Sequence, residues 1–177
     1  DDPQGRIHSD YRDSLRSQLG HQMINERLAA QSRTTDPPFL AAQAGDSRLM
    51  PTEGSWSAVA ASAEGQSLMA YQALLMEARR VAQYGFLPGE LDRARQNVLS
   101  SYDRYLAEAD KTDSVTHAEE LQRVFLTGES MPGIAYEVAL AHRYVPAFTL
   151  DELNAWGRDW LPATSRMVTV VLPDRGV

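Results

Sequence analysis

The most constraining feature of this 177-residue chain is the run Met167–Leu172, which reads Met-Val-Thr-Val-Val-Leu. β-Branched residues dominate the run and Pro173 closes it, which makes it the strongest strand candidate in the chain. Two weaker strand candidates, Phe39–Ala44 and Trp56–Ala63, are joined by a loop that carries Gly, Asp and Pro. Because the second of these is rich in Ala and Ser, its assignment depends on context more than on propensity. We expect the two to form an antiparallel pair.

The rest of the chain carries helical periodicity. From Ser9 to Gln31, apolar residues recur in steps of four, and the prolines at 37 and 38 prevent the helix from continuing. Later helices are expected at Gln66–Tyr84 and Pro88–Ala109, and shorter ones after Thr116, Pro132 and Thr149; Thr116 with Glu119 and Thr149 with Glu152 are candidate capping boxes. The resulting order predicts an α+β fold, an antiparallel sheet layered against helices, in a single domain over residues 1–177.

The helix at 66–84 illustrates how faces are assigned. Leu68, Tyr71 and Ala78 belong to one apolar stripe, which places Glu77 on the solvent side together with its arginine neighbours. Gly85 follows the last turn, where a glycine with a left-handed backbone commonly caps a helix.

Composition excludes several classes of function. With no cysteine, the chain has no disulfide scaffold, thiolate zinc site, iron–sulfur cluster or cysteine nucleophile. A net charge of -7 argues against a nucleic-acid partner, which would require a basic face. No window approaches the roughly 20 apolar residues of a membrane span, and the polar first residues do not resemble a signal peptide.

The four histidines do not fall into ligand spacing. His8, His21, His117 and His142 include no H-E-x-x-H or H-x-x-E-H pattern, which would put two imidazoles and a carboxylate on one helix face. His117 and Glu120 could share a face, but no second histidine follows, so we interpret His117 as a solvated residue of a first helical turn. No metal ligand is assigned.

Nucleophile and phosphate motifs are also missing. The stretch 54–57, Gly-Ser-Trp-Ser, lacks the second glycine of a nucleophile elbow, and no phosphate-binding glycine loop occurs. The adjacent carboxylates fall at helix ends or on the surface, where the helix dipole explains them, and the aromatic pairs fall at helical spacing and suggest packing: Asp1/Asp2, Glu108/Asp110, Glu119/Glu120 and Asp151/Glu152; Tyr102/Tyr105 and Trp156/Trp160. The sequence therefore assigns no catalytic and no cofactor-binding residue.

One run of residues resembles a known family. Residues 85–95, Gly-Phe-Leu-Pro-Gly-Glu-Leu-Asp-Arg-Ala-Arg, are similar to the entry of a long helix in the pitrilysin/insulinase-type zinc metallopeptidases. Further similar passages follow the family's order along nearly the whole chain, at 11–28, 109–114, 118–121, 125–126, 148–153 and 168–173. The chain departs from the family at Leu87-Pro88, where the family tends to have a Ser or Thr helix cap.

The resemblance implies a mitochondrial-processing-peptidase-like metallohydrolase fold, of antiparallel strands backed by helices. It further implies a non-catalytic domain, the second of a longer chain, whose zinc sits in a separate catalytic domain. The expected partners are that domain and the peptide substrate, enclosed together in a chamber, and the expected compartment is the periplasm or the cytoplasm of a bacterium. Since the H-x-x-E-H motif is absent, no catalytic or metal residue is carried over and this chain alone is expected to be inactive.

The family domain has strands before its first long helix, and here the predicted helix begins at Ser9. The N-terminal strands are therefore expected to be missing, which would leave a sheet edge exposed and favour homo-oligomers. Two alternatives stay open. A structural or assembly subunit could keep the peptidase fold without any protease role, and an unrelated helical adaptor would require Met167–Leu172 not to pair in a sheet.

Overall fold

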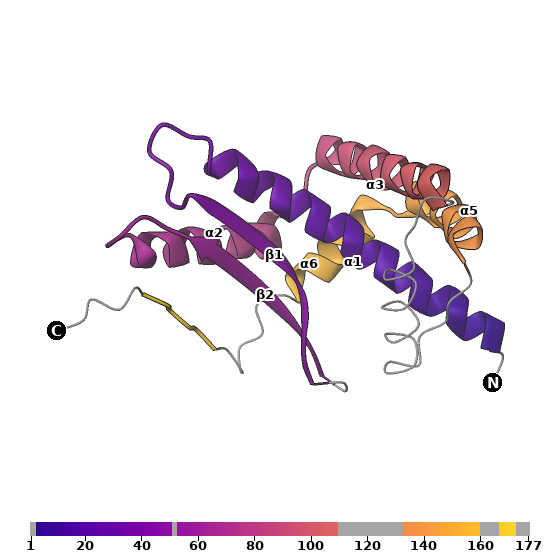
Figure 1. The fold of residues 1–177 in the computed structure, drawn as a ribbon, viewed down its shortest axis with the longest axis horizontal. Coiled ribbons are helices and arrows are strands. Elements are labelled where there is room, and N and C mark those ends of the chain that lie inside the picture. Colours follow the sequence, from indigo (N-terminus) through magenta and orange to yellow (C-terminus); the bar gives the residue numbers. More distant parts are fainter. Residues whose placement is uncertain (1–2, 51–52, 110–132, 160–166, 173–177) are drawn as a thin grey trace.

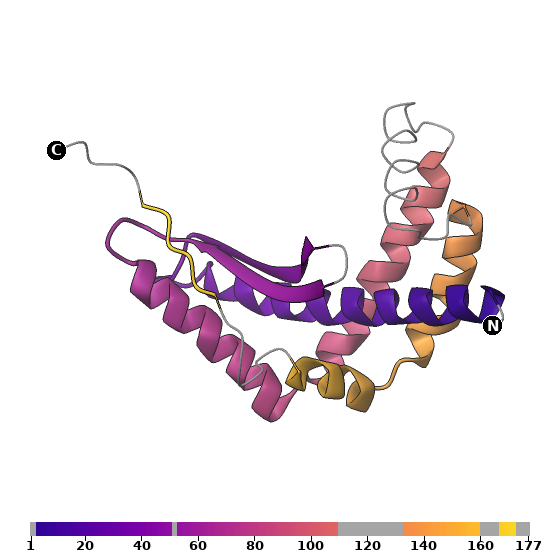
Figure 2. The same ribbon diagram turned by 90° about the horizontal axis from the view of Figure 1, so that it is seen from below.

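A computed structural model describes residues 3–50, 53–109, 133–159 and 167–172 of the chain. Figures 1 and 2 show a long central helix with a β-hairpin along one side and shorter helices packed around and across it. The elements in chain order are α1 (Pro3–Gln31), β1 (Ala41–Met50), β2 (Glu53–Ala61), α2 (Ser67–Tyr84), α3 (Pro88–Glu108), α5 (Ile134–Tyr144), the 3₁₀ turn η2 (Val145–Ala147) and α6 (Leu150–Arg158).

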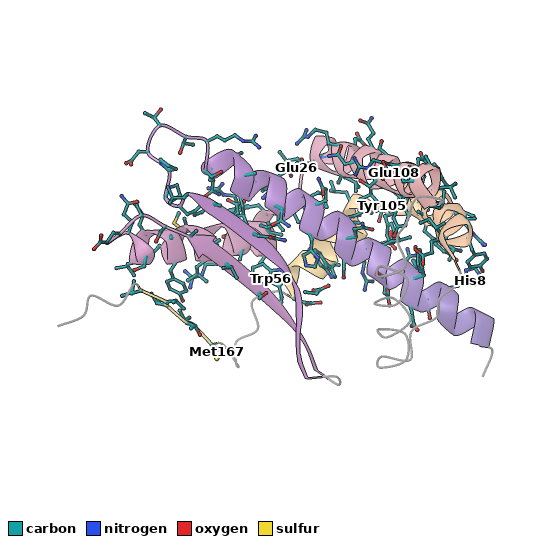
Figure 3. The ribbon with its side chains drawn as sticks, in the orientation of Figure 1. His8, Glu26, Trp56, Tyr105, Glu108 and Met167 are labelled. Atoms are coloured by element: carbon teal, nitrogen blue, oxygen red, sulfur yellow. The ribbon has the colours of Figure 1, made fainter. Side chains whose placement is uncertain are left out.

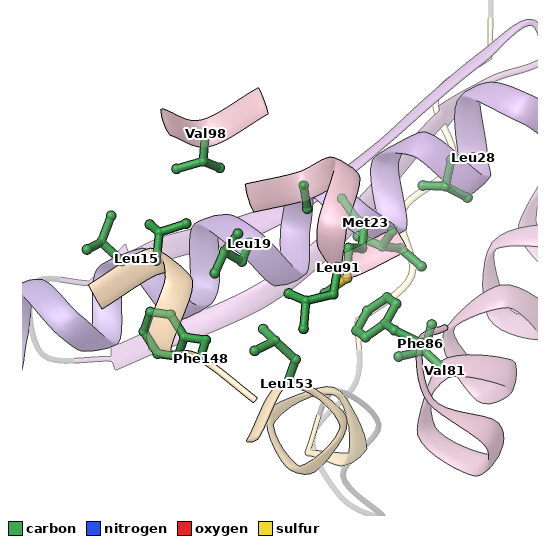
Figure 4. Packing of buried hydrophobic residues seen from close by; sticks show 14 of the residues in the cluster. Leu15, Leu19, Met23, Leu28, Val81, Phe86, Leu91, Val98, Phe148 and Leu153 are labelled. Atoms are coloured by element: carbon green, nitrogen blue, oxygen red, sulfur yellow. The ribbon is translucent and has the colours of Figure 1, made fainter. Parts of the chain in front are cut away.

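Helix α1 is the spine of the molecule. Its apolar positions Leu15, Leu19 and Met23 are at most 1% exposed, and β1, α2, α3, α5 and α6 all pack against the helix. Figure 4 shows these side chains meeting Leu91 of α3, Phe148 and Leu153 in one cluster. The predicted helix at Ser9–Gln31 is confirmed, and it begins earlier, at Pro3.

The predicted antiparallel hairpin is confirmed, but its strands are longer than the sequence indicated. β1 and β2 pair from Ala41↔Ala61 to Met50↔Glu53, with one irregularity between Arg48 and Met50. Gly45, expected in a loop, lies inside β1 opposite Ser57. The ladder extends because backbone pairing, once registered, propagates through residues of low β propensity.

Small side chains line the inner face of the hairpin. Ala44 is buried, and Ala42, Ala58 and Ala60 pack against the core, whereas Val59 on the opposite face is 69% exposed. The inner alanines let helices approach the sheet closely, which explains why a strand of such low propensity forms here. Among the described residues, one face of the sheet therefore packs against the core and the other face is exposed to solvent.

Helix α2 is present as predicted, but its buried face matches the predicted stripe only in part, at Ala78 and Val81. Leu68 is 66% exposed and Tyr71 37%, whereas Glu77, predicted to face water, is only 2% exposed. The buried positions are Ala70, Glu77, Ala78 and Val81. Glu77 can be buried because Arg27 and Gln31 of α1 donate hydrogen bonds to its carboxylate.

The end of α2 combines a glycine with a polar lock. Gly85 has φ 73°, so the predicted positive φ is confirmed, but its ψ of -164° makes it extended rather than left-handed helical. Its N–H donates to the carbonyl of Val81 at 2.8 Å. The side chain of Asn154 occupies the space where a Cβ of residue 85 would lie, and its Oδ1 accepts from the N–H of Phe86 at 2.7 Å. This lock joins α6 to the turn between α2 and α3.

The helices after Gly85 follow the prediction where the structure describes them. α3 begins at Pro88 and buries Leu91, Ala94 and Val98. The capping box at Thr149 and Glu152 opens α6, with both reciprocal hydrogen bonds formed, at 3.2 and 2.8 Å. The helix expected after Pro132 is confirmed as α5, which begins at Ile134. The expectations at Thr116, Glu119 and Trp160 lie outside the described residues.

The strand predicted at Met167–Leu172 is wrong for this structure. The run pairs with no other described residue, and Val168 and Val170 are 57% exposed while Val171 is 88% exposed. Figures 1 and 2 show it beyond β2, on the side of the hairpin away from α1. Local propensity favours an extended chain, but a strand also needs a neighbour to pair with. The α+β class is confirmed with a two-stranded sheet among the described residues.

Candidate functional site

The described residues do not fit a zinc site. Among them, no group of three or more His, Cys, Asp or Glu side chains could hold a metal ion. Figure 3 places His8 at the α5 end of the molecule, where its Nε2 lies 3.2 Å from the hydroxyl of Tyr136 and its Nδ1 lies 3.0 Å from that of Tyr144. His142 pairs instead with Asp103 at 2.7 Å, and His117 lies outside the described residues.

His21 occupies a different environment, between α1, β1 and α6. Its Nε2 lies 3.4 Å from a carboxylate oxygen of Asp46 in β1, and its ring stands edge-on to Trp156 with centroids 5.0 Å apart. Burial lowers the pKa of His21, and the nearby Asp46 carboxylate offsets only part of that effect. The imidazole is therefore held mainly neutral, with an aromatic wall on one side.

An open polar hollow, here called the α1 groove, extends from His21 along α1. The groove measures about 740 Å³ and is lined by Asp10, Asp13, Ser14, Arg16, Ser17, Gln18, His21, Gln22, Asn25, Asp46 and Tyr102. Three carboxylates and one arginine make it acidic on balance, and Arg16 is engaged with Asp13 at 3.2 Å. Such a surface can offer hydrogen bonds and negative charge to a polar or basic segment.

Asn25 closes the outer edge of β1. Its Nδ2 donates to the carbonyl of Ala44 at 2.9 Å, and its Oδ1 accepts from the N–H of Ala44 at 2.7 Å. Both backbone groups of Ala44 therefore point away from β2, so Ala44 and its partner Ala58 form a non-hydrogen-bonded pair. A side chain of α1 thus takes the place that a neighbouring strand would otherwise occupy.

The most elaborate polar constellation, here called the Arg27 network, joins α1, α2 and α3. The guanidinium of Arg27 binds both carboxylate oxygens of Glu90 at 2.6 Å each and Oε1 of Glu77 at 3.2 Å. It also donates to the carbonyl of Gly85 at 3.0 Å. Glu77 receives further hydrogen bonds from Gln31 and from the partly exposed Arg80, at 2.7 and 3.1 Å. Every oxygen of the two carboxylates is partnered.

Electrostatics of the network are mutually supportive. Burial raises the pKa of Glu90, but the hydrogen bonds from Arg27 and from the N–H of Leu87 outweigh it, so the pKa lies below its usual value. Hydrogen bonding to Glu90 raises the pKa of Arg27. The bond from Leu87 to Glu90, 2.7 Å long, is one half of a capping box; the other half cannot form because Leu87 has no side-chain acceptor. Glu90 thus caps α3 and anchors α1 at once.

Sequence reasoning missed this network, and a signal for it existed. Arg27 and Glu90 lie within passages that carry the family resemblance, but 63 residues separate them. The signal was weak: Glu77 lies at helical spacing from Ala70, Leu74 and Val81 and so shares a face with these apolar residues. The arrangement is structural in character, because its donors and acceptors satisfy one another. Arg27 and Glu90 also line a small surface hollow of about 380 Å³.

Several of the carboxylates and aromatic residues singled out from the sequence have structural roles. Glu152 caps α6 and pairs with Arg12; the N–H of Thr149 and then Arg12 lower the pKa of Glu152. Tyr102 receives a hydrogen bond from Tyr11 at 3.2 Å, whereas Tyr105 is 54% exposed, contrary to a core position. The ring of Trp156 covers Gly20 so closely that a Cβ there would overlap it.

Of the other carboxylate pairs named from the sequence, residues 1, 2, 110, 119 and 120 lie outside the described residues. In the described part of the chain, no helix is long and apolar enough to cross a membrane.

The polar clusters described above include no metal-binding group of three or more ligands.

Comparisons with known proteins give consistent results. No protein-family profile matches the chain. A protein of Arabidopsis thaliana described as "Zinc protease PQQL-like" is 27% identical over 147 residues, covering 83% of this chain and 12% of its own length. A crystal structure of the first half of the periplasmic protease PqqL from Escherichia coli superposes with a TM-score of 0.76 at 17% identity, over 86% of this chain and 33% of that one. The structure of PqqL itself gives 0.74 at 18% identity, over 90% and 17%. The chain thus spans a small part of each relative.

Proposed function

Because the chain is homologous to a portion of PqqL-like zinc proteases, of the pitrilysin family, we propose that it serves as a non-catalytic part of such a protease. In this role it forms part of the wall of the peptide-binding chamber and docks to the domain that bears the zinc. The observation that carries the proposal is the match to the first half of PqqL by a chain whose described residues hold no metal-binding group.

The surface of the molecule supports a wall rather than a reaction centre. The α1 groove presents carboxylates of Asp10, Asp13 and Asp46 to solvent, and no group of described residues there could hold a metal ion. Such a surface suits transient contacts with an extended peptide, whose backbone and basic side chains supply donors. Further along α1, the Arg27 network fixes α1, α2 and α3 relative to one another, which gives the wall its rigidity.

Two alternatives from the sequence are less well supported. A structural subunit without a protease role is disfavoured because each relative reported above is described as a protease. A helical adaptor required Met167–Leu172 to be unpaired, and the run is unpaired among the described residues. The fold match over 86% of the chain nevertheless argues against an unrelated adaptor.

Metal content and peptidase activity test the proposal. The purified chain is dialysed against zinc, then against metal-free buffer, and its zinc is measured by mass spectrometry while cleavage of a quenched fluorescent peptide is followed. We expect no stoichiometric zinc and no cleavage. One tightly held zinc per chain together with chelator-sensitive cleavage would overturn the non-catalytic role.

The docking role is tested on the parent gene and its products. An H-x-x-E-H motif upstream of this segment in the same gene is expected. The segment carrying that motif, produced separately, should cleave the peptide faster when this chain is added. If the motif is present but adding the chain changes neither rate nor sedimentation, the docking role is wrong.

A further inference from the structure

The outer edge of β2 is open. Ala58 stands opposite Ala44 in a non-hydrogen-bonded pair, so its N–H and C=O point away from β1, as do those of Ala60 by the alternation of the ladder. Among the described residues, no hydrogen bond reaches the backbone of Ala58 or Ala60 on that side. Free backbone groups along a strand edge are a template for a further strand.

The same molecule holds a strand-forming segment without a partner. Met167–Leu172 makes no backbone hydrogen bond with the described residues, and all its large apolar side chains are exposed, from 57% at Val168 to 88% at Val171. A concentration of exposed apolar β-branched residues of this kind marks an interaction site or an aggregation hazard. An open edge and an unpaired run thus coexist on one side of the molecule.

Direction decides which partner fits. In Figure 1 both β2 and the 167–172 run lead from the lower right to the upper left, so the run follows the same direction as β2. If the run paired with β2 of its own chain, the pair would be parallel, which is slightly less stable per residue than an antiparallel one. In a second copy related by a two-fold axis perpendicular to the sheet, the run is reversed and pairs antiparallel with β2.

We propose that two copies of this chain dimerise by exchanging their 167–172 runs. Each run lies between β2 of the other copy and the other copy's run, which gives one continuous antiparallel sheet in the order β1, β2, run, run, β2, β1. The axis falls between the two runs, so the interface is isologous and closed. Both open edges and both unpaired runs are satisfied at once.

Charge supports this occupant. The run contains no charged residue, and neither does the 56–61 portion of β2. Natural edge strands that resist pairing usually carry a Lys, an inward charge or a proline, and both of these segments lack all three. No like charges therefore oppose each other across either new ladder, and the apolar side chains of the two runs pack against each other.

Sedimentation over a range of concentrations tests the dimer. The 177-residue chain should approach twice its mass of 19.7 kDa at high micromolar concentration. In the proposed sheet each run is a central strand. Val170→Pro removes a backbone N–H from that strand, and its ring does not fit there, so dimerisation should weaken about 100-fold. Val170→Thr keeps the N–H and β-branching and is the matched control, expected to dimerise like the parent chain. A monomer at every concentration, or a dimer indifferent to Val170→Pro, overturns the proposal.

Disulfide trapping identifies the geometry, and the absence of native cysteine gives a clean background. Chains carrying Ala58→Cys or Ala60→Cys are mixed with chains carrying a single cysteine at one of residues 168–171, and each mixture is oxidised. At least one mixture should give a disulfide between two chains, since the run of one copy lies beside β2 of the other. A variant that carries both cysteines in one chain is oxidised in parallel. If it forms only an intrachain disulfide, or if no mixture gives a disulfide between chains, strand exchange is wrong. These outcomes do not depend on zinc or peptidase activity.

Discussion

The two edges of the hairpin are treated differently. At β1, Asn25 binds both backbone groups of Ala44, and α1 covers the strand. At β2, the corresponding groups of Ala58 have no partner among the described residues, and an unpaired apolar run lies beyond them. The α1 side is thus complete in itself, whereas the β2 side is built to receive another segment. A domain of this kind is suited to be one part of a larger assembly.

The largest effect on the free energy of unfolding is expected from a substitution in the Arg27 network, on the α1 side of the molecule. Arg27→Leu removes the arginine that Glu77 and Glu90 share. Glu77 keeps its bonds from Gln31 and Arg80, whereas Glu90 loses its bidentate partner. The free energy of unfolding should therefore fall by about 3 kcal/mol, measured by urea denaturation. Arg33→Leu, at an exposed position just after α1, is the control and should change it by less than about 0.5 kcal/mol. Equal effects of the two variants would show that the network contributes little.

Opening the β1 edge should have the next largest effect. Asn25→Ala deletes two hydrogen bonds to Ala44 and leaves two backbone groups to find water, so unfolding should become easier by about 2 kcal/mol. Gln22→Ala, one turn earlier on α1, removes only a bond to Glu26 within the same helix and serves as the control. A loss for Asn25→Ala no greater than that for Gln22→Ala would mean that the edge needs no side-chain closure.

Acid should lower the free energy of unfolding through the Arg27 network on the α1 side of the molecule. The pKa of Glu90 lies below its unfolded value, so its stabilising effect is present above about pH 4.3 and is lost as the pH falls through the folded pKa. Unfolding free energy measured against pH should therefore decline in this acidic range, and less steeply in Glu90→Gln. The same slope in both proteins would contradict a stabilising role for the Glu90 charge.

The smallest effect is expected at the 167–172 run. Val170→Pro should change the unfolding free energy of the dilute monomer by less than about 0.5 kcal/mol, because Val170 is 57% exposed and its N–H has no described partner. Urea denaturation at low micromolar concentration measures this value. A loss of 2 kcal/mol or so would indicate that the run already pairs within the monomer.

Predictability from sequence followed the range of each interaction. The capping box at Thr149 and Glu152 spans three residues, so the sequence alone predicted it. The Arg27–Glu90 pair spans 63 residues, and only the folded arrangement of α1 and α3 brings it together. Glu77 was assigned to solvent because helical periodicity alone cannot identify a buried charge whose partner lies on another element.

The run at 167–172 shows the opposite error. Its β-branched residues gave the strongest strand signal in the chain, but pairing depends on a neighbour that local propensity does not specify. The candidate functional surface was equally out of reach, because the α1 groove combines residues of α1, β1 and α3 that no short motif connects. Family resemblance, in contrast, indicated a pitrilysin-type fold before any contact was known, and the structure superposes on part of PqqL.

Amide hydrogen exchange at Ala44 and Ala58 tests the difference between the two edges most directly. In a dilute sample followed by NMR, the amide of Ala44 should be protected by Asn25, while the amide of Ala58 directly opposite should exchange near the rate of an open backbone. Raising the concentration should then protect Ala58 and leave Ala44 unchanged. Equal protection of both amides in the dilute monomer would contradict the account, because the β2 edge would already be closed.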